Sequence, residues 1–335
     1  MKWYLDSGNE GDVVISSRIR LARNIKGFPF ANLLTDEQSK KILALIKDAA
    51  TGLNLRYLSM ASMPEVNRRM LVERHIISPE MLRNTQRRAV LLSDDEQISV
   101  LLGEEDHIRI QCMTAGLDLW RALDLANKVD DVLEEKLDYG FDPRYGYKTC
   151  CPTNTGTGLR ASCMLHLPAL TASGYIETLL SSAAKLGMTV RGLYGEGSGA
   201  GGNMYQISNQ ITLGISESES VKRLEDLVKV VIEKERGMRD TLRRENDDKL
   251  VDMVSRSAGI LKSACLLSSE EAYNLLSDVR LGINMGIIKD IPIEAVNELT
   301  ITTGVAHIAE LCSEDTPSSR DKKRAEIVKK RLIKH

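Results

Sequence analysis

The chain has 335 residues, of which 42% are apolar and 27% charged, an ordinary globular composition that excludes a disordered, collagen-like or low-complexity protein. A net charge of −2 excludes a general nucleic-acid coat and a polybasic membrane binder, because both carry excess positive charge. The sequence has no signal peptide and no apolar run of about 18 residues, so we expect a cytoplasmic protein without membrane segments.

The first part of the chain mixes strand and helix patterns. A period of two predicts a strand over residues 13–21, and a capping box at 35–38 begins a helix that closes at Gly52. Helical patterns also cover 117–137 and 171–186. Short β-type runs lie at 89–92, 98–102, 108–113, 161–167, 188–193 and 205–213. Polar connections at 93–96 and 103–106 predict antiparallel hairpins, so we expect an α+β domain over residues 1–215, with helices packed on the sheet.

The strand signal ends near residue 216. Helical patterns cover 216–236, 245–261, 268–281 and 293–300, which predicts a small α-helical domain over residues 216–335. Its charge is uneven, with nine acids and two bases over 265–315 and eight bases and two acids over 316–335. The six cysteines are too few and scattered for a disulfide framework, and none has zinc-ligand spacing.

Arginines on otherwise apolar β segments are the most informative feature. Arg18 and Arg20 lie two residues apart, so both side chains leave the same face of a strand. A lone guanidinium on such a strand is either exposed or paired with a carboxylate, but several converging on one pocket would bind phosphate oxygens. The other candidates are Arg109, Arg160 and Arg191, the last beside a glycine-rich run. No Walker loop and no protein-kinase signature accompanies them.

Four blocks in this order resemble the phosphagen (guanidino) kinases. They are SSRIRLARNIKGFPF (16–30), EEDHIRI (104–110), CPTNTGTGLRAS (151–162), and RGLYGE (191–196) followed by GGNMYQISNQ (201–210). The resemblance implies an antiparallel sheet flanked by helices and transfer of phosphate from ATP, with Mg²⁺, to a guanidino group. No metal site made by protein side chains is expected.

The domain order differs from that of the creatine and arginine kinases, which carry a helical domain before the first block. Here that block begins at residue 16, and a helical region follows the catalytic blocks instead. This arrangement is similar to that of the bacterial protein-arginine kinases. Residues 320–325 (Arg320, Asp321, Lys322, Lys323, Arg324 and Ala325) match their RDxxRA motif, which the resemblance identifies as an allosteric phosphoarginine pocket. On residue pattern alone, a solvated helix face and a nucleic-acid contact remain alternatives, although no aromatic residues are interleaved for stacking.

The resemblance also implies a set of nucleotide-binding residues. The five arginines would bind the phosphates, and His75 matches a histidine that packs on adenine. The full set is Ser16, Ser17, Arg18, Ile19, Arg20, His75, Arg109, Arg160, Ala161, Ser162, Cys163, Met164, Arg191, Gly192, Leu193, Tyr194 and Gly195.

Three further residues match the family's catalytic positions. A guanidinium has a pKa above 12 and is a poor nucleophile, so carboxylates must orient it and accept its proton. By resemblance Glu105 is the base, Glu196 is the orienting partner, and the Cys151 thiolate supports the cationic substrate without becoming a covalent nucleophile.

The function that the resemblance implies is phosphorylation of arginine side chains in proteins, which marks those proteins for the Clp protease. It further implies a homodimer and a zinc-binding activator protein as partners. A small-molecule kinase acting on free arginine and a non-catalytic phosphoarginine-binding adaptor are the competing hypotheses, and no nucleic-acid or membrane partner is expected.

Overall fold

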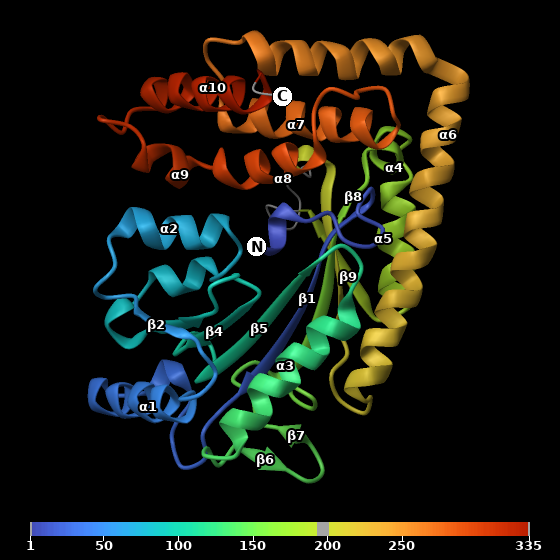
Figure 1. Cartoon of the computed structure of the whole chain (residues 1–335). Helices are drawn as coiled ribbons and strands as arrows, with labels where there is room; N and C mark the ends of the chain where they lie inside the picture. Colours follow the sequence, from blue (N-terminus) through green and yellow to red (C-terminus); the bar gives the residue numbers. More distant parts are fainter. Residues whose placement is uncertain (1, 193–200, 334–335) are drawn as a thin grey trace.

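The computed structural model describes residues 2–192 and 201–333. Its centre is an eight-stranded sheet in the order β2-β3-β4-β5-β1-β8-β10-β9, in which every neighbouring pair is antiparallel (Figure 1). The strands are β1 (Val14–Arg23), β2 (Arg56–Ser59), β3 (Ala89–Leu92), β4 (Ile98–Leu102), β5 (Ile108–Ala115), β8 (Leu159–His166), β9 (Met188–Gly192) and β10 (Met204–Asn209). A separate hairpin joins β6 (Phe141–Asp142) to β7 (Gly146–Tyr147). The predicted hairpins β3–β4 and β4–β5 are confirmed.

The described residues also form ten α-helices. They are α1 (Asp36–Ala49), α2 (Glu65–Glu73), α3 (Leu119–Glu134), α4 (Pro168–Ala172), α5 (Ile176–Lys185), α6 (Glu217–Ser263), α7 (Ser269–Asn284), α8 (Ile293–Thr302), α9 (Val305–Glu310) and α10 (Pro317–Ile333). The capping box of α1 is present, because Thr35 and Gln38 each accept the other's backbone N–H. The helix predicted over 171–186 is two helices, interrupted where Gly174 has a φ of 71°.

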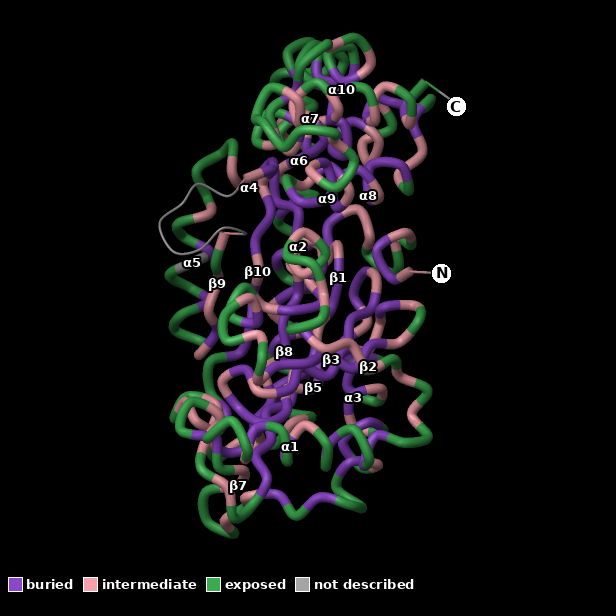
Figure 2. Tube along the Cα trace, turned by 90° about the vertical axis from the view of Figure 1, so that its left-hand side faces the viewer, coloured by how far each residue is buried: buried purple, intermediate pink, exposed green. Residues whose placement is uncertain are grey.

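One face of the sheet forms the main core. Ile19 and Leu21 of β1 are fully buried there, beside Leu123 and Ala126 of α3. The first half of α6 packs on the same core, and Figure 2 shows the buried chain following the strands. Because strand residues alternate between faces, Arg18 and Arg20 point to the opposite face.

The helices α7 to α10 lie at one end of the sheet (Figure 1), where α7, α8 and α10 pack with the second half of α6 around a second core. The 47-residue α6 connects the two cores, with Val221 and Leu224 in the first and Val254 and Leu261 in the second. The two helices predicted there are one, with non-helical dihedrals at Asn246 (φ −144°, ψ 42°). The domain boundary expected at residue 216 coincides with the start of α6. The helix itself packs on the first core before Asn246 and on the second core after it.

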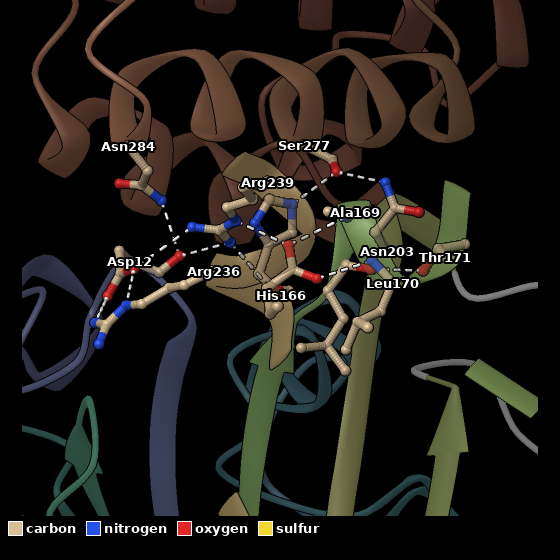
Figure 3. A network of polar contacts seen from close by, with 12 residues as sticks. Asp12, His166, Ala169, Leu170, Thr171, Asn203, Arg236, Arg239, Ser277 and Asn284 are labelled. Carbon is tan, nitrogen blue, oxygen red and sulfur yellow. Dashed lines mark hydrogen bonds and ion pairs between the residues drawn. The ribbon is translucent and has the colours of Figure 1, made fainter. Parts of the chain in front are cut away.

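Buried polar groups hold the helical part against the sheet (Figure 3). The Glu235 carboxylate is fully buried and accepts the backbone N–H groups of Ala169 and Leu170 at 3.1 and 2.9 Å, at the start of α4. It also accepts Nε of Arg239 at 2.8 Å, and Arg239 donates to the backbone oxygen of Asp12 at 3.1 Å. One charged pair therefore connects α6, α4 and the N-terminal segment.

Removing one member of this pair should be strongly destabilising. Glu235→Ala leaves the buried Arg239 without its nearest carboxylate and leaves two backbone donors unpaired, so we expect a loss of about 3–5 kcal/mol of unfolding free energy. Urea denaturation measures this loss of unfolding free energy. Glu233→Ala, at an exposed position on the same helix, is the control. Equal stabilities of the two variants would contradict the role of Glu235.

Candidate active site

The register of the sheet brings the predicted arginines onto one face. Arg20 of β1 lies directly opposite Arg160 of β8, and Arg18 lies opposite Ser162. On the other side of β1, Ala22 is paired with Arg109 of β5. Because directly paired residues point to the same side of a sheet, these guanidinium groups share the face opposite the main core. Arg191 joins them through β10, where it is paired with Gln206.

The cluster carries more positive than negative charge. Burial, together with the nearby charges of Arg160 and Arg109, lowers the pKa of Arg18 to about 10. Burial and the same kind of repulsion lower the pKa of Arg20 well below its usual value. The buried Nε atoms of Arg20 and Arg160 find no hydrogen-bond partner among the described residues. These guanidinium groups lie close together despite their burial and mutual repulsion, and a bound polyanion would offset both.

Two adjacent glutamates touch the edge of this cluster, and they differ in exposure. Glu104 has a side chain only 2% exposed, pairs with Arg109 and accepts the hydroxyl of Ser78. Glu105 is 37% exposed and accepts Nη2 of Arg109 at 2.8 Å. Glu105 also lines an open cavity of about 470 Å³ together with Glu80 and Glu104. Glu105 is therefore the carboxylate that an incoming cation can reach.

Cys151 lies near the same cluster. Burial, and then the charges of Arg191 and Arg109, lowers the pKa of Arg160, and the nearby Cys151 and Glu105 oppose this with smaller effects. The Sγ of Cys151 lies 3.0 Å from the hydroxyl of Thr153. The structure thus brings Glu105, Cys151 and Arg160 together, as the sequence led us to expect, while their catalytic roles stay predictions.

His75 lies on the arginine face, after the end of α2. Burial, and then the charge of Arg18, lowers the pKa of His75 to about 4, so its ring is neutral at pH 7. His75 lines the same cavity as Arg18, Ser16 and Met164. A neutral, flat ring beside a cationic cluster is compatible with packing against a nucleotide base.

Four of the predicted nucleotide-binding residues are on the wrong face for that role. Ser17, Ile19, Ala161 and Cys163 point into the main core, where their exposure is 0%. Ser17 instead donates to the backbone oxygen of Gly116 and accepts the N–H of Asp118, at the start of α3. The blocks are continuous in sequence, but a strand presents only every second side chain to the cavity. The alternating residues Ser16, Arg18, Ser162 and Met164 do line it.

The remaining predictions near the glycine-rich run divide at residue 192. Arg191 and Gly192 line the cavity with Arg18 and Arg20. Leu193, Tyr194, Gly195 and Glu196 lie outside the described residues, so the orienting role of Glu196 stays a prediction.

The six residues of the RDxxRA match have different environments. Arg324 is 1% exposed and donates to the backbone oxygens of Thr303 and Leu267 and to the Asp321 carboxylate. Ala325 is in the helical core. Arg320 pairs with Asp315, and Lys323 pairs with Glu326. Lys322 is exposed. Arg324 thus connects α10 to the rest of its domain, and the allosteric role of these six residues stays a prediction.

Sequence reasoning missed several residues of the site. Gln206 accepts Nη2 of Arg18 at 2.6 Å, and Gln111 donates to the backbone oxygen of His75 at 2.8 Å. Gln206 was within reach, because it lies in the block 201–210 and shares the alternation of the arginine face. Tyr273, Thr300 and Ile301 of the helical part also line the cavity, and no motif marks them.

The arginine face is suited to a polyanion, and comparison with known proteins identifies the class as phosphotransferases that act on guanidino groups. Residues 37–238 match the family described as ATP:guanido phosphotransferase, C-terminal catalytic domain, and residues 247–335 match the protein-arginine kinase McsB C-terminal domain. The chain belongs to the protein-arginine kinase branch of the ATP:guanido phosphotransferase family.

Relatives and solved structures support this placement. The protein-arginine kinase of Halothermothrix orenii is 46% identical over 334 residues, covering 98% of this chain and 96% of the relative. That of Desulforamulus reducens is 45% identical, covering 99% and 95%. A crystal structure of lombricine kinase matches with a TM-score of 0.60 and 27% identity, over 70% of this chain and 71% of that one. The duplicated taurocyamine kinase of Schistosoma mansoni, with bound transition-state analogue components, matches with a TM-score of 0.61 and 25% identity, over 77% and 40%.

Within residues 2–192 and 201–333, no helix is both long and apolar enough to cross a lipid bilayer.

Proposed function

We propose that this protein transfers the γ-phosphate of ATP to a guanidino nitrogen of arginine side chains in proteins. The observation that carries the proposal is the single sheet face on which Arg18, Arg20, Arg109 and Arg160 converge beside the accessible carboxylate of Glu105. The relatives named protein-arginine kinase support a protein substrate rather than free arginine.

The charges of the site suggest how it would work. The arginines neutralise the triphosphate and the charge that develops during transfer, which is the main requirement of phosphoryl transfer. Mg²⁺ would supply further charge neutralisation on the phosphate oxygens, and the described residues contain no cluster of three or more His, Cys, Asp or Glu for a separate metal site. We therefore propose that Mg²⁺ binds together with ATP, through the phosphate oxygens that the arginines also contact.

The acceptor would enter from the carboxylate side. The open cavity beside Glu105 is lined by three glutamates and by Arg87 and Arg88, which pair with Asp36 and Glu80. A cationic side chain that enters it would meet the exposed carboxylate of Glu105. We infer that Glu105 binds the guanidinium and accepts its proton as the nitrogen attacks phosphorus, and that Glu196 orients the same group. ADP then leaves with the bridging oxygen.

The proposal extends to regulation and partners. We propose that the helical domain mediates homodimerisation and that the RDxxRA residues 320–325 bind phosphoarginine allosterically, with Arg320 and Arg324 on the phosphate and Asp321 on the guanidinium. A zinc-binding activator protein and the Clp protease system are the proposed partners, and a cytoplasmic location stays a prediction.

The deciding experiment is incubation with Mg·ATP and an unfolded basic protein, followed by mass spectrometry under conditions that preserve acid-labile P–N bonds. We expect phosphate on arginine. Phosphate found only on serine, threonine or tyrosine would contradict the proposal, as would rapid ADP release with free arginine in the absence of protein.

A supporting role for Cys151 makes a separate prediction. Cys151→Ser should lower the rate of arginine phosphorylation by no more than about tenfold, because the sulfur contributes charge without forming a bond to phosphorus. Steady-state kinetics measures it, with Cys265→Ser, an exposed cysteine of the helical domain, as the control. Complete loss of transfer in Cys151→Ser alone would indicate a covalent nucleophile.

A further inference from the structure

The helical domain lines both cavities that meet at the arginine cluster. One cavity has a volume of about 320 Å³ and the other about 830 Å³. Six residues line both of them, three from the sheet domain and three from the helical domain: Arg18, Arg20, His75, Tyr273, Thr300 and Ile301. Helices α7 and α8 therefore lie directly across the cavity from the proposed phosphate-binding groups.

The lining of the smaller cavity combines cationic, apolar and polar groups. Arg18, Arg20 and Arg191 supply the guanidinium groups of the arginine face. Much of the remainder is aromatic or apolar (Trp3, Tyr4, Met113, Met164, Met204 and Ile301), and Asp6, Ser7, Arg280, Asn297 and Thr300 also line it. Trp3, Tyr4, Met113 and Ile301 also form a small buried cluster that joins the N-terminal 3₁₀ turn, β5 and α8. A nucleotide offers matching groups, because its phosphates are anionic and its base has flat apolar faces with polar edges.

The side chain of Tyr273 is held in place at this cavity. Its ring lies against Gly202, in the turn at 201–203, where a β-carbon would overlap the ring carbons. The next residue, Asn274, accepts the N–H of Gly202 at 3.1 Å. A base that binds beside Tyr273 would therefore meet an ordered ring, which reduces the entropy lost on binding.

The whole of α7 is fixed to the sheet by buried hydrogen bonds (Figure 3). The Ser277 hydroxyl lies 2.8 Å from Nε2 of His166, the last residue of β8, and accepts Nδ2 of Asn203 at 3.0 Å. Asn284, at the end of α7, donates to the backbone oxygen of Asp12 at 2.9 Å. The position of Tyr273 is thus determined by contacts between the two parts of the chain.

We propose that the helical domain supplies one wall of the nucleotide site and that Tyr273 contacts the adenosine of ATP. This inference rests on the proposed function, because it takes ATP as the phosphate donor. Nucleotide affinity then depends on the docking of α7, so a ligand that shifts the helical domain changes ATP binding.

Direct binding to the full-length protein tests the wall without requiring turnover. Tyr273→Ala should weaken Mg·ADP binding roughly tenfold, the loss of one base-aromatic contact, in isothermal titration calorimetry. Tyr273→Phe, which keeps the ring, should bind within about twofold of the unmodified protein. Tyr175→Ala, at an exposed tyrosine that contacts Lys234 and is not among the lining residues of either cavity, is the control and should leave binding unchanged.

Pyrophosphate separates the adenosine wall from the phosphate cluster, because it carries the phosphates of ADP without the nucleoside. When pyrophosphate competes with ADP for the site, the affinity for pyrophosphate should be the same in Tyr273→Ala as in the unmodified protein. Equal weakening of both ligands, or unchanged ADP binding, would overturn the inference. If the unmodified protein binds Mg·ADP and phosphorylates no arginine, the proposed function fails while the wall is still tested by Tyr273→Ala.

Discussion

Glu105→Gln should lower the rate of arginine phosphorylation by about 10²–10⁴-fold, the range expected when a general base is lost. Glutamine keeps the size of the side chain and can still accept a hydrogen bond from Arg109, but it cannot take a proton from the guanidinium. Mg·ATP binding should stay within about threefold, because the carboxylate lies at the edge of the phosphate-binding cluster. Single-turnover kinetics gives the rate, and calorimetry gives the affinity.

The matched control for this variant is Glu314→Gln, an exposed position between α9 and α10. It removes the same charge from the protein and should leave the transfer rate unchanged. An unchanged rate in Glu105→Gln would refute its assignment as the base. A loss of ATP affinity as large as the loss of rate would assign Glu105 to the stability of the arginine cluster instead.

Arg20→Lys should lower transfer on the order of 10³-fold, because arginine contacts with a transferring phosphate are commonly worth that much or more. Lysine keeps a positive charge but loses the planar fork that binds two phosphate oxygens. The same burial and the same neighbours, Arg18, Arg109 and Arg160, that lower the pKa of Arg20 would lower that of lysine from an already smaller value.

A pH profile tests this reasoning with a defined sign. A cation with a lowered pKa loses its proton as the pH rises, so the residual activity of Arg20→Lys should fall with rising pH in a range where the unmodified protein stays active. Arg256→Lys, at an exposed position on α6 that pairs with Asp252, is the control. A profile parallel to that of the unmodified protein would show that the surroundings of residue 20 do not lower its pKa.

The local sequence pattern was sufficient to predict much of the secondary structure of the sheet domain. A period of two shows that Arg18 and Arg20 share a face, and this follows from backbone geometry alone. The short polar connections between β3, β4 and β5 permitted only hairpins. The helical character of residues after 216 followed in the same way. The continuity of α6 through Asn246 did not, because tertiary packing on both sides of a locally unfavourable residue can keep a helix continuous.

Which residues meet at the site could be known only from the pairing of the strands. Arg20 meets Arg160 only because β1 and β8 pair in one register across about 140 residues of chain, and a shift of one residue would turn one of them into the core. The same fact explains the misplaced residues. Ser17 and Ala161 belong to the matching blocks, but alternation directs their side chains toward the main core.

The amino-acid sequence alone determined the kinds of secondary structure, the number of guanidinium groups available for an anion, and the family to which the catalytic blocks are similar. These properties depend on neighbours in the chain. Only the tertiary structure decided that Glu105 is accessible whereas Glu104 is not, that Arg324 is internal, and that Tyr273 lines the same cavities as Arg18. Burial, strand register and domain docking are set by contacts between distant segments, and no short stretch of residues specifies them.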